Sequence, residues 1–510
     1  MTKRTSARAF LCCTLLLSSG AGCAGSDAGS ADGAISDSGG GDGARPDSRA
    51  PDGAAPDGPM ADGSTADGGG SFTGTIFDMP MIQDAATASC AFTNRRDATK
   101  DGISLDLFDV SYTSWESIDG SLMPITIRGF AAKPRGALGP MPGVVQAHGL
   151  GGHASEGNAT GPAALLGMFV LAFTGPGGGD PADPATAVSE GRPSGFDSGR
   201  RMFDTIPDPR GSWFWGHAVA AMRGLTCLET RAEVDPARLG MTGYSAGGVV
   251  TLISSGVDDR IVASVPLSAS LRWEVATQAP GAWQHALLRA AGYDTNSSHW
   301  LQLVEMLDAG TLLGSTNTAI WMVNGTSDEF FPMTAHMGTY DAFAHEERRL
   351  SFVANGDHGC LLAAGVPGVD RAADIQARAD LRARGAQRAW FHHHFGTDAD
   401  YSCVPAEPTL TIAPGTGVTM SVDTRCSAFD VEAVKVWYSG DGGFTYIAAD
   451  LNSLGGGSYG AFVALAADAL LVGDVQYVEA AFSLTPARFS VSSRPNLPAG
   501  FVPDIPCVIP

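Results

Sequence analysis

Basic residues are scarce in this sequence. Its 510 residues include 32 Lys and Arg against 54 Asp and Glu, which gives a formal net charge of −22 at pH 7. A protein that binds nucleic acid needs a basic surface to meet the phosphate backbone. We therefore exclude nucleic acid as a partner. Histidine is also unevenly spread, because none of the 11 histidines lies beyond residue 403.

The N-terminus lacks an apolar run that is long enough to cross a bilayer. Residues 10–17 are apolar, whereas a spanning helix needs about 20 such residues. Basic residues precede this run and small residues follow it, which is typical of a secretory signal, here residues 1–22. The Ala-Gly-Cys that ends at Cys23 resembles a bacterial lipobox, so we expect the protein to be exported and to carry a lipid on Cys23. We expect this lipid to be its only contact with a membrane, at the outer membrane or the cell surface. Cleavage after Ala21 would instead give an ordinary extracellular protein.

Residues 23–70 lack any apolar periodicity. Nine Asp recur at intervals of five, from Asp27 to Asp67. A period of five matches neither a helix nor a strand, so the segment cannot bury an apolar face, and we expect a disordered tether. Calcium binding by the Asp-Gly units is the alternative, but a calcium site needs six or more converging oxygens.

The cysteines form an even set beyond the expected lipid site. Six of them could make three disulfides in an oxidising compartment, in any of 15 pairings. These six are Cys90, Cys227, Cys360, Cys403, Cys426 and Cys507. Cys23 is the odd one, as a lipid-bearing cysteine should be.

Residues 71–403 alternate apolar runs with helical stretches, which indicates a mostly parallel sheet with helices on both faces, an α/β fold. Helices are predicted over 214–230 and 370–394, and a helical cap insertion over 271–315 carries three tryptophans. The predicted strands are 125–131, 144–147, 169–173, 239–242, 261–266, 320–323 and 349–353.

Residues 404–510 lack a convincing amphipathic helix. Short alternating stretches between Gly- and Pro-rich turns predict a small β-sandwich. The predicted strands are 410–412, 418–422, 433–438 and 475–482. Residues 439–446 resemble an Asp-box, which predicts a hairpin and is only weak evidence for sugar binding.

Two serines match the pattern G-x-S-x-G of a nucleophile elbow, Ser245 and Ser458. Ser245 follows an apolar strand and precedes a helix, the strand–turn–helix context that the motif requires. Ser458 lies in a glycine-rich loop with no histidine after it. We therefore take Ser245 as the nucleophile.

A serine needs a base, and the base needs a carboxylate, in the order serine, acid, histidine. Asp328 follows the strand at 320–323, and His358 follows the strand at 349–353. Both would lie beyond the carboxyl ends of strands, where open sheets collect functional groups. Glu329 and Asp357 are competing acids.

The oxyanion hole needs two backbone N–H groups. The residue after the nucleophile, Ala246, supplies one. The strand at 144–147 ends in an H-G-x-G-G loop, where we expect Leu150 to supply the other. His148 in this loop is interpreted as an orienting residue.

The other histidines point to no metal. His217, His336 and His345 are placed in helices, and His392, His393 and His394 are consecutive, so they fan around a helix and cannot face one ion. We expect neither a metal nor another cofactor.

Together, the H-G-x-G-G loop, the approach to Ser245 and the Gly-Thr-Ser-Asp and Asp-His-Gly segments resemble the dienelactone hydrolase, acetyl xylan esterase and cephalosporin-C deacetylase branch of the α/β-hydrolases. S9-type peptidases share this catalytic domain. The resemblance covers about 110–400 and implies the same triad and oxyanion donors. It implies a serine esterase acting through an acyl-enzyme on a small-molecule or polysaccharide ester. Residues 71–110 are too short for a peptidase β-propeller. The alternatives are an S9-type peptidase and a catalytically silent carbohydrate-binding or adhesion lipoprotein.

Overall fold

The computed structural model describes residues 76–502, apart from 184, 194–199, 280, 309, 359–371, 414–416, 467, 481–485 and 499. The expected signal segment, Cys23 and the aspartate-rich tether lie outside these residues. Among the described residues, every helix is too short or too polar to span a membrane.

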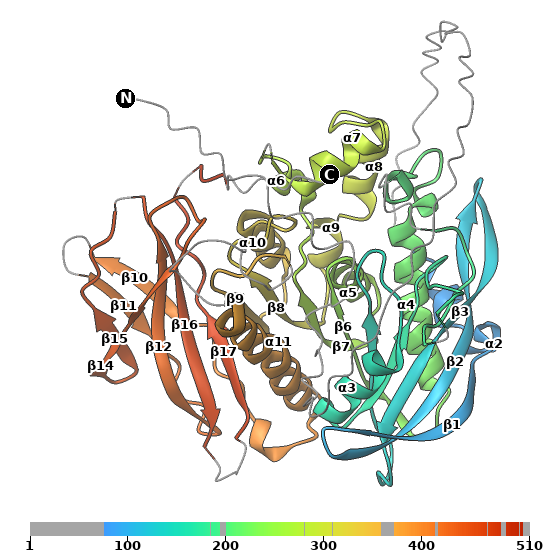
Figure 1. The fold of residues 1–510 in the computed structure, drawn as a ribbon, viewed down its shortest axis with the longest axis horizontal. Helices are drawn as coiled ribbons and strands as arrows, with labels where there is room; N and C mark the ends of the chain where they lie inside the picture. Colours follow the sequence, from blue (N-terminus) through green and yellow to red (C-terminus); the bar gives the residue numbers. More distant parts are fainter. Residues whose placement is uncertain are drawn as a thin grey trace, which may run out of the picture. The chain divides into compact units, whose positions relative to one another are not determined.

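A nine-stranded sheet organises the described part of the chain (Figure 1). Its order is β1-β2-β3-β5-β4-β6-β7-β8-β9, and the strands from β5 to β9 run parallel. β1, β2 and β3 add an antiparallel part at one edge. The strands are β1 (Ala91–Lys100), β2 (Ile103–Ile118), β3 (Ser121–Pro134), β4 (Met141–Ala147), β5 (Phe169–Phe173), β6 (Val234–Tyr244), β7 (Ile261–Leu267), β8 (Ala319–Gly325) and β9 (Arg348–Val353). The predicted α/β fold is confirmed.

Helices cover both faces of this sheet. Central strands such as β5 and β8 are buried at every residue, as expected for parallel strands covered on both sides. Adjacent residues of β4 enter different cores, Val144 on one side and Val145 on the other, because side chains alternate along a strand. One face carries α4 (Trp213–Glu229) and α5 (Ala246–Val257), and the other carries α3 (Glu156–Leu166) and α11 (Ala372–Phe395).

Four short helices occupy the region predicted as a helical insertion, within the residues that the structure describes. They are α6 (Trp273–Ala276), α7 (Trp283–Ala290), α8 (Ser298–Met306) and α9 (Gly310–Leu313). The three tryptophans noted in the sequence form one aromatic cluster. The ring of Trp273 lies 6.1 Å from that of Trp283 and 6.4 Å from that of Trp300. Trp273 also lies 5.4 Å from the ring of Phe214 in α4, so the insertion packs onto the core of the main sheet.

Three further helices complete the described part, together with short 3-10 turns. They are α1 (Met79–Gln83), α2 (Ala85–Ala88) and α10 (Met333–Ala342), and the turns span Arg200–Phe203, Pro209–Gly211 and Ala399–Tyr401. His336 lies in α10, but the placement of His345 in a helix was wrong. α10 ends at Ala342, and the chain turns back toward β9 with the Glu347 N–H donating to His345 Nδ1 at 3.1 Å.

Two four-stranded antiparallel sheets follow α11 in the described residues, as predicted, and we call them the C-terminal sandwich. Their orders are β10-β11-β15-β14 and β13-β12-β16-β17. The strands are β10 (Thr409–Ala413), β11 (Gly417–Ser421), β12 (Phe429–Ser439), β13 (Ile447–Asp450), β14 (Asn452–Gly455), β15 (Ser458–Ala461), β16 (Leu470–Glu479) and β17 (Arg488–Ser492).

The Asp-box forms the hairpin between β12 and β13. The Ser439 hydroxyl accepts a hydrogen bond from the Gly443 N–H (2.9 Å), and Asp441 Oδ1 accepts one from the Thr445 N–H (2.9 Å). These bonds close the turn from within, so the motif has the structural role that the sequence predicted.

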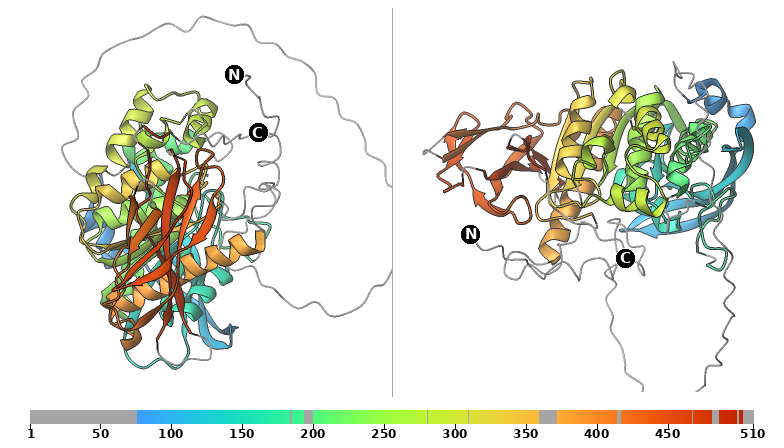
Figure 2. Two further views of the ribbon diagram at one scale, coloured as in Figure 1. Left: turned by 90° about the vertical axis from the view of Figure 1, so that its left-hand side faces the viewer. Right: turned by 90° about the horizontal axis from the view of Figure 1, so that it is seen from above.

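α11 lies between the main sheet and the C-terminal sandwich (Figures 1 and 2). Arg382 of α11 pairs with Asp474 of β16 at 2.5 Å, and both side chains are fully buried. The Ser490 hydroxyl donates a second hydrogen bond to Asp474. A buried, bonded ion pair therefore joins the two parts.

Two disulfides lie within the described residues. Cys90 is bonded to Cys227 and Cys403 to Cys426. The first joins the segment before β1 to α4, and the second joins the start of the C-terminal part to the segment after β11. Cys360 and Cys507, the remaining two of the six, lie outside the described residues.

Candidate active site

Ser245 stands on the sharp turn between β6 and α5. Its backbone has φ 57° and ψ −123°, a strained conformation for a residue that carries a side chain. An added Cβ at Gly247 would collide with the Ala147 carbonyl, and one at Gly243 would collide with the Gly247 carbonyl. The motif needs both glycines because the turn packs against the end of β4.

One expected oxyanion donor adjoins this serine, and the loop that carries the other comes close to it. Ala246 is the first residue of α5, so its N–H has no acceptor within the helix. The loop after β4 approaches from the other side: an added Cβ at Gly149 would lie 3.2 Å from Ser245 Cβ and 3.3 Å from the Tyr244 carbonyl oxygen. Leu150 follows Gly149 in this loop, and its role as the second donor stays a prediction. The N-terminal end of α5 also favours negative charge there.

His148 orients this loop. Its Nε2 accepts a hydrogen bond from the Gly175 N–H (2.8 Å), so the neutral ring carries its proton on Nδ1. Nδ1 then donates to the Gly149 carbonyl at 2.6 Å. Burial lowers the pKa of His148 to about 4, so the ring stays neutral at physiological pH. This agrees with the interpretation of His148 as an orienting residue, and His217 of α4 packs behind it at 4.8 Å.

Asp328 lies in the loop between β8 and α10, and we call residues 326–331 the acid loop. Its side chain is completely buried. Its Oδ1 accepts hydrogen bonds from the Phe330 N–H (2.9 Å) and the Phe331 N–H (2.8 Å). These two bonds fix the carboxylate and leave Oδ2 for another donor.

His358 follows β9, and we call residues 354–358 the histidine loop. Its Nδ1 lies 3.2 Å from Asp328 Oδ2, and its Nε2 lies 2.8 Å from Ser245 Oγ. The bond to the carboxylate places the proton on Nδ1, so Nε2 can accept the serine proton. The ring is nearly buried, and the Tyr244 hydroxyl donates to the His358 carbonyl.

The carboxylates around His358 raise its pKa. Burial is the largest single effect and lowers this pKa, but the charge and hydrogen bond of Asp328 and the charges of Glu329 and Asp357 together outweigh it. The pKa therefore lies above the ordinary value of 6.5.

Glu329, one competing acid, meets the backbone of His358. Its Oε2 accepts a hydrogen bond from the His358 N–H at 3.1 Å. Burial, aided by the charge of Asp328, raises the pKa of Glu329. Glu329 lies in the acid loop and outside any helix, because α10 begins only after Pro332.

Aromatic rings pack around the histidine, and the sequence analysis did not identify them. Phe330 stacks on the His358 ring at 4.2 Å, and Phe331 lies at 5.5 Å. Trp283 of the helical insertion stacks in turn on Phe330 at 4.8 Å. The insertion therefore reaches the candidate site through Phe330.

The remaining predicted or excluded residues lie apart from this site. Ser458 begins β15 of the C-terminal sandwich. His392 shares a hydrogen bond with the Thr397 hydroxyl (2.7 Å), and His393 with the Tyr401 carbonyl (2.9 Å). The described part of the chain contains no group of three side chains that could hold a metal ion.

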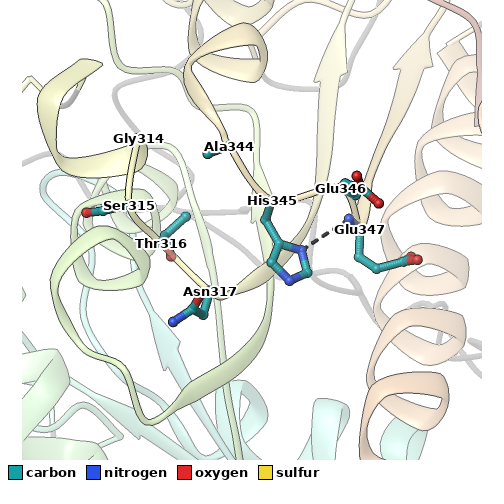
Figure 3. Close-up of a pocket in the computed structure, with 8 residues that line it drawn as sticks. All are labelled: Gly314, Ser315, Thr316, Asn317, Ala344, His345, Glu346 and Glu347. Atoms are coloured by element: carbon teal, nitrogen blue, oxygen red, sulfur yellow. Dashed lines mark hydrogen bonds between the residues drawn. The ribbon is translucent and has the colours of Figure 1, made fainter.

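A surface pocket of about 570 Å³ also lies away from these residues (Figure 3). Its walls come from residues 314–317 and 344–347, which precede β8 and β9. Ser245, Asp328 and His358 contribute nothing to its lining.

The fold and the line from Asp328 through His358 to Ser245 define the class, a serine hydrolase of the α/β-hydrolase fold. The chain belongs to the acetyl xylan esterase family, whose model matches residues 98–363, just over half of the chain. It is therefore a serine carboxylic ester hydrolase. The match includes the candidate site and ends before the C-terminal sandwich.

Solved esterases resemble the chain. An acetyl xylan esterase from Paenibacillus sp. R4 has 18% sequence identity and a TM-score of 0.46, over 56% of this chain and 87% of that one. Acetyl xylan esterase 1 from Thermoanaerobacterium sp. JW/SL YS485 has 15% identity and a TM-score of 0.42, over 57% of this chain and 90% of that one. Est1E from Butyrivibrio proteoclasticus, solved with ferulic acid, has 14% identity and a TM-score of 0.34, over 52% and 91%. No curated protein matches the chain.

Proposed function

We propose that this enzyme removes acetyl groups from an esterified polysaccharide through an acyl-enzyme formed on Ser245. The observation that carries the mechanism is the hydrogen-bonded line from Asp328 to His358 to Ser245, at 3.2 and 2.8 Å. The family supports the acetyl group and the polysaccharide.

In the first step His358 acts as general base. The Ser245 hydroxyl attacks the ester carbonyl carbon while its proton passes to His358 Nε2. The charge that develops on the carbonyl oxygen is stabilised by the N–H groups of Leu150 and Ala246. The intermediate then collapses, the bond to the alcohol breaks, and His358 returns the proton to the leaving alcohol oxygen.

In the second step water replaces the alcohol. His358 takes a proton from the water as its oxygen attacks the acyl carbon, and the proton then passes to Ser245 Oγ as the ester bond breaks. Acetate leaves and the free serine returns. Asp328 holds the imidazole in the required tautomer and stabilises its cation in both steps.

A fluorophosphonate probe tests the nucleophile, because it phosphonylates an activated serine. Ser245→Ala should abolish labelling and esterase activity, since it removes the hydroxyl that is hydrogen-bonded to the ring of His358. Ser458→Ala is the matched control, because Ser458 stands in the same five-residue pattern, and it should label like the parent. Labelling of Ser245→Ala at the parental rate would show that the assignment is wrong.

A substrate panel tests the reaction class. p-Nitrophenyl acetate should be hydrolysed faster than the butyrate and octanoate esters, and acetylated xylan should release acetate. Faster turnover of peptidyl anilides would favour the peptidase alternative. No turnover of any ester, with the protein folded, would favour a silent binding protein.

We further propose that residues 1–22 direct export, that Cys23 carries a lipid, and that residues 23–70 tether the enzyme. The sequence alone supports this proposal. Cys23→Ala expressed in a bacterial host should move the enzyme from the membrane fraction to the soluble fraction without changing its specific activity. An equal distribution of parent and variant would indicate ordinary secretion.

A further inference from the structure

The acid loop and the histidine loop hold each other through their backbones. The Thr326 N–H donates to the Val353 carbonyl (3.0 Å), and the Ser327 N–H donates to the Gly356 carbonyl (2.9 Å). The Asn355 N–H donates to the Thr326 hydroxyl at 2.9 Å. Whatever fixes the histidine loop therefore also fixes the geometry between the carboxylate and the ring.

The side chain of Asn355 joins the histidine loop to the C-terminal sandwich. Its Oδ1 accepts a hydrogen bond from the Tyr446 N–H (2.7 Å), and its Nδ2 donates to the Tyr446 carbonyl (2.9 Å). The amide thus satisfies both backbone groups of one residue, as a neighbouring strand would. Asn355 and Tyr446 are both almost fully buried. Tyr446 ends the Asp-box turn, which Ser439 and Asp441 close from within.

β9, the strand that leads to this loop, is also bonded to the sandwich. The Ser351 hydroxyl donates to the Ser490 carbonyl, and the Phe352 N–H donates to the Ser492 hydroxyl at 2.8 Å. Both acceptors belong to β17. β9 is the last strand of its sheet, so the Phe352 N–H is a backbone donor of an edge strand, whereas Ser351 meets β17 through its side chain.

A third contact lies between β9 and Asn355. Arg378 of α11 donates to the Ala354 carbonyl at 3.1 Å. Its guanidinium lies over the ring of Trp437 in β12, 4.9 Å from the centroid. Four of the residues 351–355 therefore contact the sandwich, directly or through Arg378, and His358 follows three residues after Asn355.

We propose that the C-terminal sandwich is a positioning element of the esterase site, and that Asn355 is the positioning residue through which the Asp-box hairpin fixes His358. The inference rests on the proposed function, since it takes His358 as the base. It goes beyond the family, because the family match ends at residue 363 and the sandwich lies after it.

The geometry leaves little freedom for the loop to move. Proton transfer needs the base within about 3.2 Å of the serine oxygen, and His358 Nε2 lies at 2.8 Å from Ser245 Oγ. The hydrogen bond between His358 Nδ1 and Asp328 Oδ2 is 3.2 Å long, so a small displacement of the ring would break it. Loss of the Asn355 amide would leave two buried backbone groups of Tyr446 unpaired, so the hairpin and the loop must separate or admit water.

Asn355→Gly tests the inference in the full-length protein. Asn355 has φ 60°, a conformation that glycine adopts without strain, so the variant removes the amide and keeps the backbone. With p-nitrophenyl acetate, we expect kcat to fall about 10- to 100-fold, the range that a misplacement of about 1 Å produces. KM should stay within about threefold of the parent, because the groups that bind the ester are unchanged.

Two controls separate positioning from stability. Asn94→Gly makes the same change at another asparagine with positive φ (49°), in β1 at the opposite edge of the sheet. Tyr340→Phe removes another hydrogen bond to the C-terminal part, from the tyrosine hydroxyl to Glu407 at 2.8 Å, without touching the histidine loop. Both variants should keep kcat within about twofold of the parent.

Fluorophosphonate labelling provides a second readout. If Asn355→Gly displaces the base in a folded protein, labelling slows but still reaches one probe per chain. A labelled fraction that falls with kcat would mean partial unfolding and would overturn the inference, as would parental kcat in Asn355→Gly. If Ser245→Ala still labels, the proposed function itself fails. If Ser245→Ala does not label and Asn355→Gly labels at the parental rate, only the positioning role fails.

Discussion

At the scale of single residues, the site depends on groups that have little freedom to move. Ser245 stands in a strained turn between glycines that no larger residue could replace, and Asp328 is fixed by two backbone N–H groups. His358 lies between them with one ring nitrogen for each. Such preorganised contacts do not have to form during the reaction.

Substitution of the two acids separates their roles. Asp328→Asn should lower kcat about 10,000-fold, because the amide favours the wrong histidine tautomer. Glu329→Gln should cost less than about tenfold, because the amide oxygen can still accept the His358 N–H. The kinetics of both variants with p-nitrophenyl acetate check this. A greater loss in Glu329→Gln would make Glu329 the acid of the triad.

The pH profile reports on His358. The base must be neutral to accept a proton, and its pKa lies above 6.5 because the carboxylates outweigh burial. The acid limb of kcat/KM should therefore fall at a pH above 6.5, and activity should be lost as the pH drops further. In Glu329→Gln the limb should move to lower pH, because one of the charges that raise the pKa is gone. Activity that stays flat down to about pH 4 would exclude His358 as the base.

Sequence reasoning found the residues that belong to local motifs and missed those defined by distant contacts. Ser245 was identifiable from the strand, turn and helix around it, and the triad order then indicated Asp328 and His358. Their catalytic roles stay predictions that the experiments above test. The role of Asn355 depends on Tyr446, 91 residues later in the chain, and no local pattern encodes that pairing. The Asn-Gly pair that precedes both Asp328 and His358 was the available signal.

At the scale of elements, α11 provides much of the contact between the main sheet and the C-terminal sandwich. It covers one face of the main sheet and meets β17 with its other side. The apolar residues along one side of α11 predicted this helix from the sequence. They could not show that charged residues on its other side are also buried. Arg382 is such a residue, and its charge is paired with Asp474 in β16.

Removal of one partner of the buried Arg382–Asp474 pair should lower the free energy of unfolding. Arg382→Met leaves the Asp474 carboxylate buried without its cation and should cost about 3–5 kcal/mol in the free energy of unfolding. Arg488→Met is the matched control, because its pair with Glu432 is exposed, and it should cost less than about 1 kcal/mol. Adding Asp474→Asn to Arg382→Met should restore part of the loss. Denaturant titration measures all three, and equal effects of the two single variants would contradict the prediction.

At the scale of the whole molecule, the pattern of apolar residues predicted both the parallel sheet and the C-terminal sandwich. Parallel strands are continuous apolar runs in the sequence, whereas sandwich strands are short stretches of alternating apolar and polar residues. The antiparallel strands β1 and β2 were missed. β1 alternates weakly and is largely exposed, so it lacks the apolar pattern that marks the other strands. How the sandwich meets β9 and α11 depends on side chains far apart in sequence, which periodicity cannot pair.

The contact of the C-terminal sandwich with the edge strand β9 has a consequence for the behaviour of the protein in solution. An uncovered outer strand offers its N–H and carbonyl groups to any similar strand, and proteins that expose one tend to self-associate. In this chain β17 contacts β9, and the Ser492 hydroxyl accepts the hydrogen bond of the Phe352 N–H. We therefore expect the C-terminal sandwich also to protect the enzyme against aggregation, and a shortened form ending after α11 to form soluble oligomers or to precipitate.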